Sequence, residues 1–293
     1  MNAARLDAEL VRRGLARSRR RAAELVAEGR VTVHGTRAGK PSQPVAPDAD
    51  VAVRSTTEYV SRAGHKLAGA LDALAELVDR PPEVRGAHCL DAGASTGGFT
   101  EVLLGRGAAR VVAVDVGHGQ LVAHLAADPR VVSREGLNVR DLRSSDLGVP
   151  PTVVVADLSF ISLTLVVPTL LAVAAPGADL LLLVKPQFEV GRGRLGPGGV
   201  VTSAERREQA VLAVAAVLER GAAVRAVVPS ALPGPAGNRE YFLWAVAHRP
   251  DDGHDGAGTA NDAVHRAVVG GLPALVAPPA PPAPPAPPAG SSS

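Results

Sequence analysis

The stretch that decides the fold reads AHCLDAGASTGGF and covers residues 87–99. Its first half, Ala87 to Asp91, predicts a strand, and the part from Gly98 to Leu104 predicts a helix after a glycine turn. Glycines let a backbone approach a ligand closely, and the start of a helix offers N–H groups that have no partner in the helix. The segment therefore predicts a ligand site between a strand and a helix.

The rest of this region repeats the pattern of an apolar strand that ends in a polar residue. Val111–Asp115 and Val153–Asp157 end in carboxylates, and Leu180–Val184 runs into Lys185. Nearly continuous apolar strands with helices between them are typical of a parallel sheet covered on both faces, which binds ligands at the carboxyl ends of its strands. Further helices are predicted near 62–79 and 204–220, and further strands near 223–229 and 241–247.

The first part of the chain has a different character. Two short amphipathic helices within 5–28 precede a strand at 30–35 and another at 51–53, which predicts a small α+β unit. Residues 1–40 hold ten basic and four acidic side chains, a net charge of +6, whereas the whole chain of 293 residues carries only +2. The remainder is thus slightly acidic, and a basic head on such a body is typical of a polyanion-binding module.

Composition excludes several classes of protein. The single cysteine, Cys89, excludes a disulfide framework and a cysteine-based zinc site, and no metal site is predicted. The N-terminus has no apolar signal segment, and the longest apolar stretch, Leu163–Ala175, contains Pro168 and is shorter than the roughly 20 residues of a membrane helix. We therefore expect a soluble, cytoplasmic protein that does not insert into membranes.

Lysine is so rare here that its positions are informative. The chain has 31 basic residues, and only Lys40, Lys66 and Lys185 are lysines. Arginine keeps its proton under working conditions, whereas a lysine can lose it when its surroundings disfavour the charge. Lys66 and Lys185, with Asp157 and Glu240, are predicted to surround one cleft. For each residue taken alone, an ordinary surface ion pair remains open.

The glycine turn indicates the kind of cofactor. A dinucleotide fingerprint would place a glycine at position 95, which is serine, and an acidic residue stands two positions before Gly93. Asp115, at the end of the next strand, can accept hydrogen bonds from ribose hydroxyls. S-adenosylmethionine is favoured over NAD. The predicted cofactor-binding residues are Asp91, Gly93, Ala94, Ser95, Gly97, Gly98, Phe99, Asp115, Val116 and Asp157.

Longer motifs then indicate a family. The head is similar to an S4 RNA-binding domain, and the body resembles FtsJ-like ribose 2′-O-methyltransferases, a Rossmann-like class I fold with a mostly parallel sheet. The combination closely resembles the TlyA family through the strings SRAGHKL, LDAGASTGGFTE, VDVGHGQL, VADLSFISL, LVKPQFEVG, LPGPAGN and EYFLW.

The resemblance implies a function and a set of residues. It implies methyl transfer from S-adenosylmethionine to the 2′-hydroxyl of a cytidine in ribosomal RNA, of the small or the large subunit. The catalytic set in chain order is Lys66, Asp157, Lys185 and Glu240, and Arg5, Arg19 and Lys40 are expected to bind RNA. The expected domains are the S4-like head at 1–58, the methyltransferase at 59–249, a linker with a short helix at 250–270 and a disordered Pro/Ala-rich tail at 271–293.

Some features depart from the family, and other functions stay open. His118 stands where we expect an aromatic residue, the Pro-rich tail extends beyond the family core, and residues 56–60 are less basic than expected. The alternatives, in order, are a non-catalytic ribosome-assembly factor, a pore-forming haemolysin and an NAD dehydrogenase. The sequence indicates neither the oligomeric state nor the nucleotide that is modified.

Overall fold

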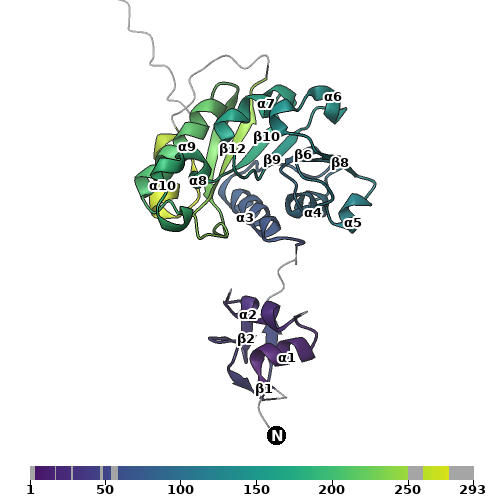
Figure 1. Ribbon diagram of the computed structural model, residues 1–293, viewed down its shortest axis with the longest axis vertical. Helices are drawn as coiled ribbons and strands as arrows, with labels where there is room; N and C mark the ends of the chain where they lie inside the picture. The colour runs from purple at the N-terminus through teal and green to yellow at the C-terminus, as the bar shows by residue number, and fades with distance from the viewer. Residues whose placement is uncertain are drawn as a thin grey trace, which may run out of the picture. The chain divides into compact units, whose positions relative to one another are not determined.

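The computed structural model describes residues 4–16, 18–27, 29–46, 49–53, 59–249 and 260–276. The chain divides into two compact units, Met1–Glu58 and Tyr59–Ser293, and each is described by itself (Figure 1).

The first unit combines two helices with short strands, as the sequence predicts. The helices α1 (Leu6–Arg12) and α2 (Arg19–Ala27) pack with a three-stranded antiparallel sheet of β3 (Thr36–Arg37), β2 (Val31–Val33) and β5 (Val51–Val53). A second pair joins β1 (Ala4–Arg5) to β4 (Pro44–Val45). His34 and Gly35 connect β2 to β3 and both have positive φ, the conformation that matches a two-residue hairpin turn to the twist of its strands.

The second unit is built on one eight-stranded sheet with the order β13-β11-β12-β10-β9-β6-β7-β8. Strands β6 to β10 run parallel, whereas β12 is antiparallel to both of its neighbours. This arrangement confirms the Rossmann-like methyltransferase fold. The strands are β6 (His88–Ala92), β7 (Arg110–Asp115), β8 (Val131–Glu135), β9 (Val153–Ala156), β10 (Asp179–Val184), β11 (Ala222–Pro229), β12 (Tyr241–Ala247) and β13 (Ala274–Leu275).

Helices cover both faces of this sheet, because successive side chains of each strand point to opposite faces. In β10, Leu180 and Leu182 join one core cluster, and Leu181 and Leu183 join the other. The first cluster lies under α6 (Ser144–Leu147), α7 (Val167–Val173), α9 (Ala204–Leu218) and α10 (Asn261–Gly270). The second lies under α3 (Arg62–Leu77), α4 (Gly98–Gly105) and α5 (Ala123–Ala126), and α3 and α4 lie together below the sheet in Figure 1.

The order of the strands fixes where a ligand can bind. From β6 the chain runs through β7 to the edge strand β8, and it then returns to β9 on the other side of β6. Such a reversal opens a crevice at the carboxyl ends of the two central strands. Residues 93–97 follow β6 there, and Asp157 directly follows β9. The fold therefore brings the glycine turn and Asp157 to one place.

The structure differs from the sequence prediction at the C-terminal end. The predicted methyltransferase domain ended at residue 249, but α10 belongs to the same core cluster as α9, and β13 pairs with β11. Residues 271–276 thus include a sheet strand, although they were predicted to start the disordered tail. The linker at 250–259 and the tail from residue 277 lie outside the described residues.

Two further findings bear on the excluded classes. Among the described residues, no helix has the length and apolarity needed to cross a bilayer. The same residues contain no group of three or more His, Cys, Asp or Glu side chains able to hold a metal ion. Of the segment 56–60, only residues 59 and 60 are described.

The crossing of α3 and α4 yields a stability prediction. A Cβ at Gly98 would lie 2.9 Å from the backbone nitrogen of Gly64, whereas a Cβ at Gly105, in the same helix, would meet nothing within 4 Å. Gly98→Ala should therefore destabilise the second unit by about 1–3 kcal/mol through overpacking. Gly105→Ala should stabilise it by about 0.4–1 kcal/mol, because alanine has less freedom to lose on folding.

Urea unfolding followed by the fluorescence of Trp244, the single tryptophan, measures both changes in this unit. Equal effects of the two substitutions would show that the helix crossing does not require glycine at position 98.

Candidate active site

The turn between β6 and α4 requires glycine at two positions. Gly93 has φ +87°, and a Cβ there would lie 2.6 Å from the carbonyl oxygen of Asp157. Gly97 has φ +99° and caps α4, and a Cβ there would run into Leu125. Both the left-handed conformation and the close contact exclude a side chain at these positions. The turn therefore keeps its backbone bare beside Asp157.

Ser95 takes the place of the glycine that a dinucleotide fingerprint would have. It has φ +48°, which is uncommon for a residue other than glycine. Its N–H donates to Asp115 Oδ2 at 2.9 Å, and its hydroxyl lies 3.1 Å from Gln120 Oε1. These contacts hold Ser95 in the left-handed conformation and tie the glycine turn to the segment after β7.

Asp115 lies where a ribose could be bound. Its Oδ1 accepts the N–H of Gly117 at 2.7 Å, and its Oδ2 accepts that of Ser95. Each oxygen keeps a lone pair for another donor, such as a ribose hydroxyl. Val116 follows and is largely exposed, so its apolar surface is available to a flat ring.

Asp91 is fully buried at the end of β6. Thr100 Oγ1 donates to its Oδ2 at 2.6 Å, and its Oδ1 has no hydrogen-bond partner among the described residues. Desolvation raises the pKa of Asp91 to about 7. The hydrogen bond from Thr100 lowers this pKa in part, and the charge of Asp157 adds a smaller increase. A buried acceptor beside the turn suits a cationic group such as the amino group of S-adenosylmethionine.

Two of the predicted cofactor residues also have packing roles. The ring of Phe99 is buried in the core and packs against Phe242, with the ring centroids 6.0 Å apart. The Cβ position of Gly98 faces α3. These two residues therefore shape the start of α4, and their side-chain positions do not line the crevice. Ala94 is buried within the turn.

The four predicted catalytic residues form two ion pairs. Lys66 lies in α3, and Glu240 lies just before β12. Lys66 Nζ is 2.5 Å from Glu240 Oε2, and the two side chains are only 7% and 1% exposed. Lys185 Nζ lies 2.6 Å from Asp157 Oδ1, with 11% and 13% exposed. Lys185 also donates to Ser159 Oγ at 2.9 Å. The lysines are thus divided between separate carboxylates.

Strand pairing brings the two ion pairs together. Asp157 and Lys185 follow the neighbouring parallel strands β9 and β10, and Val184 pairs with Tyr241, so Lys185 and Glu240 flank one register position. Gln187, two residues after Lys185, places its amide Nε2 3.4 Å from Glu240 Oε1. Since Gly93 lies against the carbonyl of Asp157, the glycine turn adjoins the same edge.

Three supporting groups were not predicted. Buried Asn238 accepts the N–H of Val201 and donates to the carbonyl of Gly199, which fixes the chain just before Glu240. Buried Arg207 donates to the carbonyls of Val201 and Thr202 and to Tyr241 Oη. Glu189 accepts from Ser162 Oγ and from the N–H of Leu163, and burial raises its pKa. Only the tertiary structure gives these residues their partners.

An aromatic pair stands beside the second ion pair. Phe160 is 92% exposed and has φ +64°, and its ring centroid lies 5.2 Å from that of Phe188. Lys185 Nζ lies 5.9 Å from the centroid of Phe188. An exposed ring held in a rare backbone conformation is typical of a functional position.

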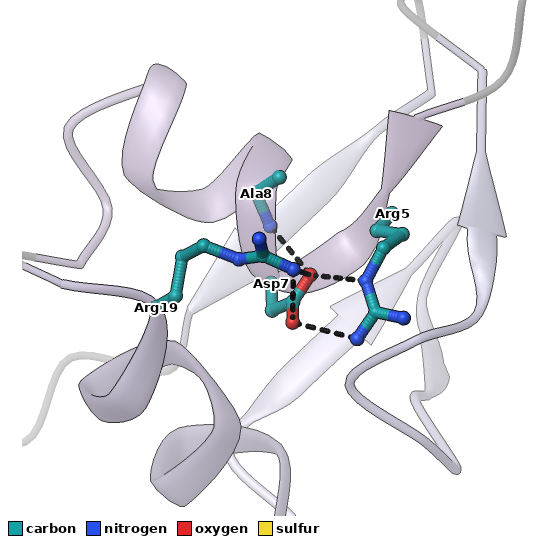
Figure 2. Close-up of polar contacts among 4 residues, drawn as sticks. All are labelled: Arg5, Asp7, Ala8 and Arg19. Carbon is teal, nitrogen blue, oxygen red and sulfur yellow. Dashed lines mark hydrogen bonds and ion pairs between the residues drawn. The ribbon is translucent and has the colours of Figure 1, made fainter.

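The predicted RNA-binding residues lie on neighbouring segments of the first unit. Arg5 and Arg19 both contact the carboxylate of Asp7 (Figure 2). Lys40 is exposed and precedes Pro41, whose carbonyl accepts the N–H of Asp7. The unit therefore gathers three cations around the start of α1.

Asp91 gives the second unit a distinct pH dependence. Its pKa is higher in the folded protein than its ordinary value near 3.8, so the folded state binds this proton more tightly than the unfolded state. Stability from Asp91 is fully present below pH 4 and is lost as the pH rises through 7. Asp91→Asn should remove this loss, which is roughly 4 kcal/mol at most.

Urea unfolding without cofactor, followed by Trp244 fluorescence at pH 4.5 and pH 8, measures the effect. The advantage of the variant over the parent protein should be several times larger at pH 8 than at pH 4.5. A difference that does not change with pH would mean that Asp91 titrates normally.

Comparisons with known proteins identify the families that the two parts of the chain match. Residues 59–247 match the FtsJ-like methyltransferase family, and residues 4–51 match the S4 domain. The chain is 53% identical to the 16S/23S rRNA (cytidine-2′-O)-methyltransferase TlyA of Mycobacterium tuberculosis, over 90% of this chain and 97% of that protein. It is 36% identical to hemolysin A of Brachyspira hyodysenteriae, over 83% and 99%.

A solved structure shows the same similarity. The structure of a proposed hemolysin from Streptococcus thermophilus shares 33% identity and a TM-score of 0.65, over 91% of this chain and 96% of that chain. With S4 and FtsJ-like regions in this order and relatives along most of its length, the chain belongs to the TlyA family of S-adenosylmethionine-dependent methyltransferases.

Proposed function

We propose that Lys66, Asp157, Lys185 and Glu240 carry out the transfer of a methyl group from S-adenosylmethionine to the 2′-hydroxyl of a cytidine in ribosomal RNA. The observation that supports this most is the pairing of Lys185 with Asp157 at 2.6 Å, beside the bare glycine turn. The reaction needs a cofactor crevice, a group that handles the hydroxyl proton and a surface for RNA. In this proposal the glycine turn, the Lys185–Asp157 pair and the basic first unit would supply them.

The glycine turn and two carboxylates are suited to hold the cofactor. Asp115 would accept the ribose hydroxyls, Val116 would contact the adenine, and Asp91 would accept the amino group. Gly93, Ala94, Ser95 and Gly97 would leave room for the chain of the methionine part. When bound, the cofactor supplies a methyl group on a positively charged sulfur.

The two lysines have different tasks in this proposal. The 2′-hydroxyl is a poor nucleophile, so the protein must align its oxygen and receive its proton. Lys185 is the more accessible lysine and would hold the 2′-oxygen, with Asp157 fixing the position of the ammonium group. Once its ammonium has given up a proton, the Lys185 amine would accept the hydroxyl proton, and Asp157 would hold the ammonium so formed. Lys66 is held by Glu240 and would orient the nucleotide.

The two ion pairs, one buried and one mostly covered, argue against the non-catalytic alternative. Removing charges from water carries a large penalty, and replacing a buried ion pair by apolar residues is often neutral or stabilising. A ribosome-assembly factor would need the basic first unit but would have no use for these pairs at the edge of the crevice. Because the proposed substrate is ribosomal RNA, we also propose that the protein acts in the cytoplasm.

Substitutions of Lys185 test the catalytic assignment. Lys185→Ala should lower methyl transfer about 10²–10⁴-fold, the range of a lost acid–base group. Binding of S-adenosylhomocysteine, measured by calorimetry, should change little, because the glycine turn is intact. The assay follows labelled methyl groups from S-adenosylmethionine to unmodified ribosomal subunits and locates a ribose that resists alkaline cleavage.

Two further variants sharpen this test. Lys185→Arg keeps the charge but cannot release a proton, so partial activity would show that the charge alone aligns the oxygen. Arg110→Ala removes an exposed cation at the start of β7, at the opposite edge of the sheet, and should leave the rate unchanged. Full activity of Lys185→Ala would refute the assignment.

Cations of the first unit should act on RNA binding. Arg19→Ala and Lys40→Ala should each reduce the slope of log affinity against log salt by about 1, as expected for one lost phosphate contact. The KM for ribosomal RNA should rise, because these residues bind RNA. The kcat should stay unchanged, because they are not part of the catalytic set. Filter binding of 23S rRNA across a KCl series gives the slope, with Arg110→Ala as the control. An unchanged slope in both variants would place the RNA elsewhere.

A further inference from the structure

A buried carboxylate holds two arginines that come from different parts of the first unit. Arg5 donates through Nε and Nη2 to the two oxygens of Asp7, at 3.1 and 2.9 Å. Arg19, which opens α2, places its Nη2 at 3.3 and 3.1 Å from the same two oxygens. The Asp7 side chain is 8% exposed, whereas those of Arg5 and Arg19 are 53% and 59% exposed. Figure 2 shows the two guanidinium groups on opposite sides of the carboxylate.

The arrangement leaves each guanidinium group with donors to spare. Among the described residues, no hydrogen bond uses Nη1 of Arg5 or of Arg19. The two parallel bonds from Arg5 fix the plane of its guanidinium group, which a single contact would not do. The cluster has two positive charges and one negative charge, so it retains a net positive charge with fixed geometry.

Other arginines of this unit are held differently. Glu9 is also buried and pairs with Arg12 and Arg13, but Arg13 is mostly covered and donates to the carbonyl of Ala49. Arg12 is 64% exposed, so Glu9 holds one accessible guanidinium group, whereas Asp7 holds two. Arg20 is 91% exposed, and its partner Glu24 is 43% exposed, so their contact fixes little.

We propose that Asp7 is a positioning residue, which sets Arg5 and Arg19 as a rigid clamp for phosphate groups of the RNA backbone. This inference rests on the proposed function, in which the first unit binds ribosomal RNA. A preset pair of guanidinium groups loses less freedom on binding than two free side chains do, and it can contact adjacent phosphates in a defined geometry.

Simple electrostatics makes the opposite prediction. Asp7 is an anion next to a polyanion, and its pKa is held near 2 chiefly by the hydrogen bond from Arg5, so it stays charged at neutral pH. If only net charge mattered, removing this anion would tighten RNA binding. If Asp7 positions the arginines, removing it weakens binding. The two effects differ in sign.

The experiment compares Asp7→Asn with Glu24→Gln in the full-length protein, using filter binding of 23S rRNA. Each substitution removes one negative charge from the same unit. Asp7→Asn should weaken binding about tenfold, on the scale of a lost charge-assisted contact. Glu24→Gln should leave binding unchanged or tighten it. In an Arg5→Ala/Arg19→Ala background, Asp7→Asn should have no further effect.

A charge-conserving pair keeps the test valid if Asp7→Asn does not fold, which far-UV circular dichroism would show. Arg5→Lys keeps the charge but loses the two parallel bonds to Asp7, and it should also weaken binding, whereas the matched Arg20→Lys should not. Tighter binding by Asp7→Asn, or an equal loss in the double-alanine background, would overturn the positioning role. If the parent protein itself fails to bind 23S rRNA, the proposed function fails, and the clamp fails with it.

Discussion

The ion pair between Lys66 and Glu240 joins parts of the chain that are 174 residues apart. It links α3, which precedes the first strand of the large sheet, to the segment just before β12. Strand β12 lies between β11 and β10 in that sheet. Removing one partner would leave a buried charge without compensation, a loss that commonly exceeds the worth of the pair itself. The pair therefore connects α3 to the segment that leads into β12, and α3 itself crosses α4 at Gly64 and Gly98.

Energetically unfavourable features, namely a buried carboxylate and strained backbone conformations, lie at the same edge of the sheet. Asp91 is buried, one of its oxygens has no partner among the described residues, and Ser95 and Phe160 have left-handed backbones. Such features persist only where the surrounding structure holds them, and they concentrate at functional sites. Here the rigid parallel strands β6, β9 and β10 supply that support, because their main chains are fully paired and their side chains are packed on both faces.

Both units use carboxylates to hold cations in place. Asp157 holds Lys185 at the crevice, and Asp7 holds Arg5 and Arg19 at the start of α1. In each case the carboxylate is well covered, so the interaction is less screened than a surface pair. The difference lies in the cation. Lysine can exchange a proton with a substrate, whereas arginine keeps its charge and offers a planar set of donors, which suits phosphate recognition.

The sequence by itself determined the fold class, because periodicity and glycine spacing are local, and the resemblance to the TlyA family supplied the catalytic candidates. Apolar strands that end in Asp91, Asp115, Asp157 and Lys185 require a parallel sheet, whose carboxyl ends share one edge. The edge strand β8 escaped prediction, since its second half is exposed and polar, and so did β13, whose two residues form a strand only by pairing with β11.

The tertiary structure alone decided the partners. Lys66 pairs with Glu240, and Lys185 pairs with Asp157. Phe99 packs in the core, and Asp7 contacts two arginines from separate elements. These outcomes depend on how distant segments pack, and no local pattern in the chain encodes which carboxylate a given lysine or arginine will meet.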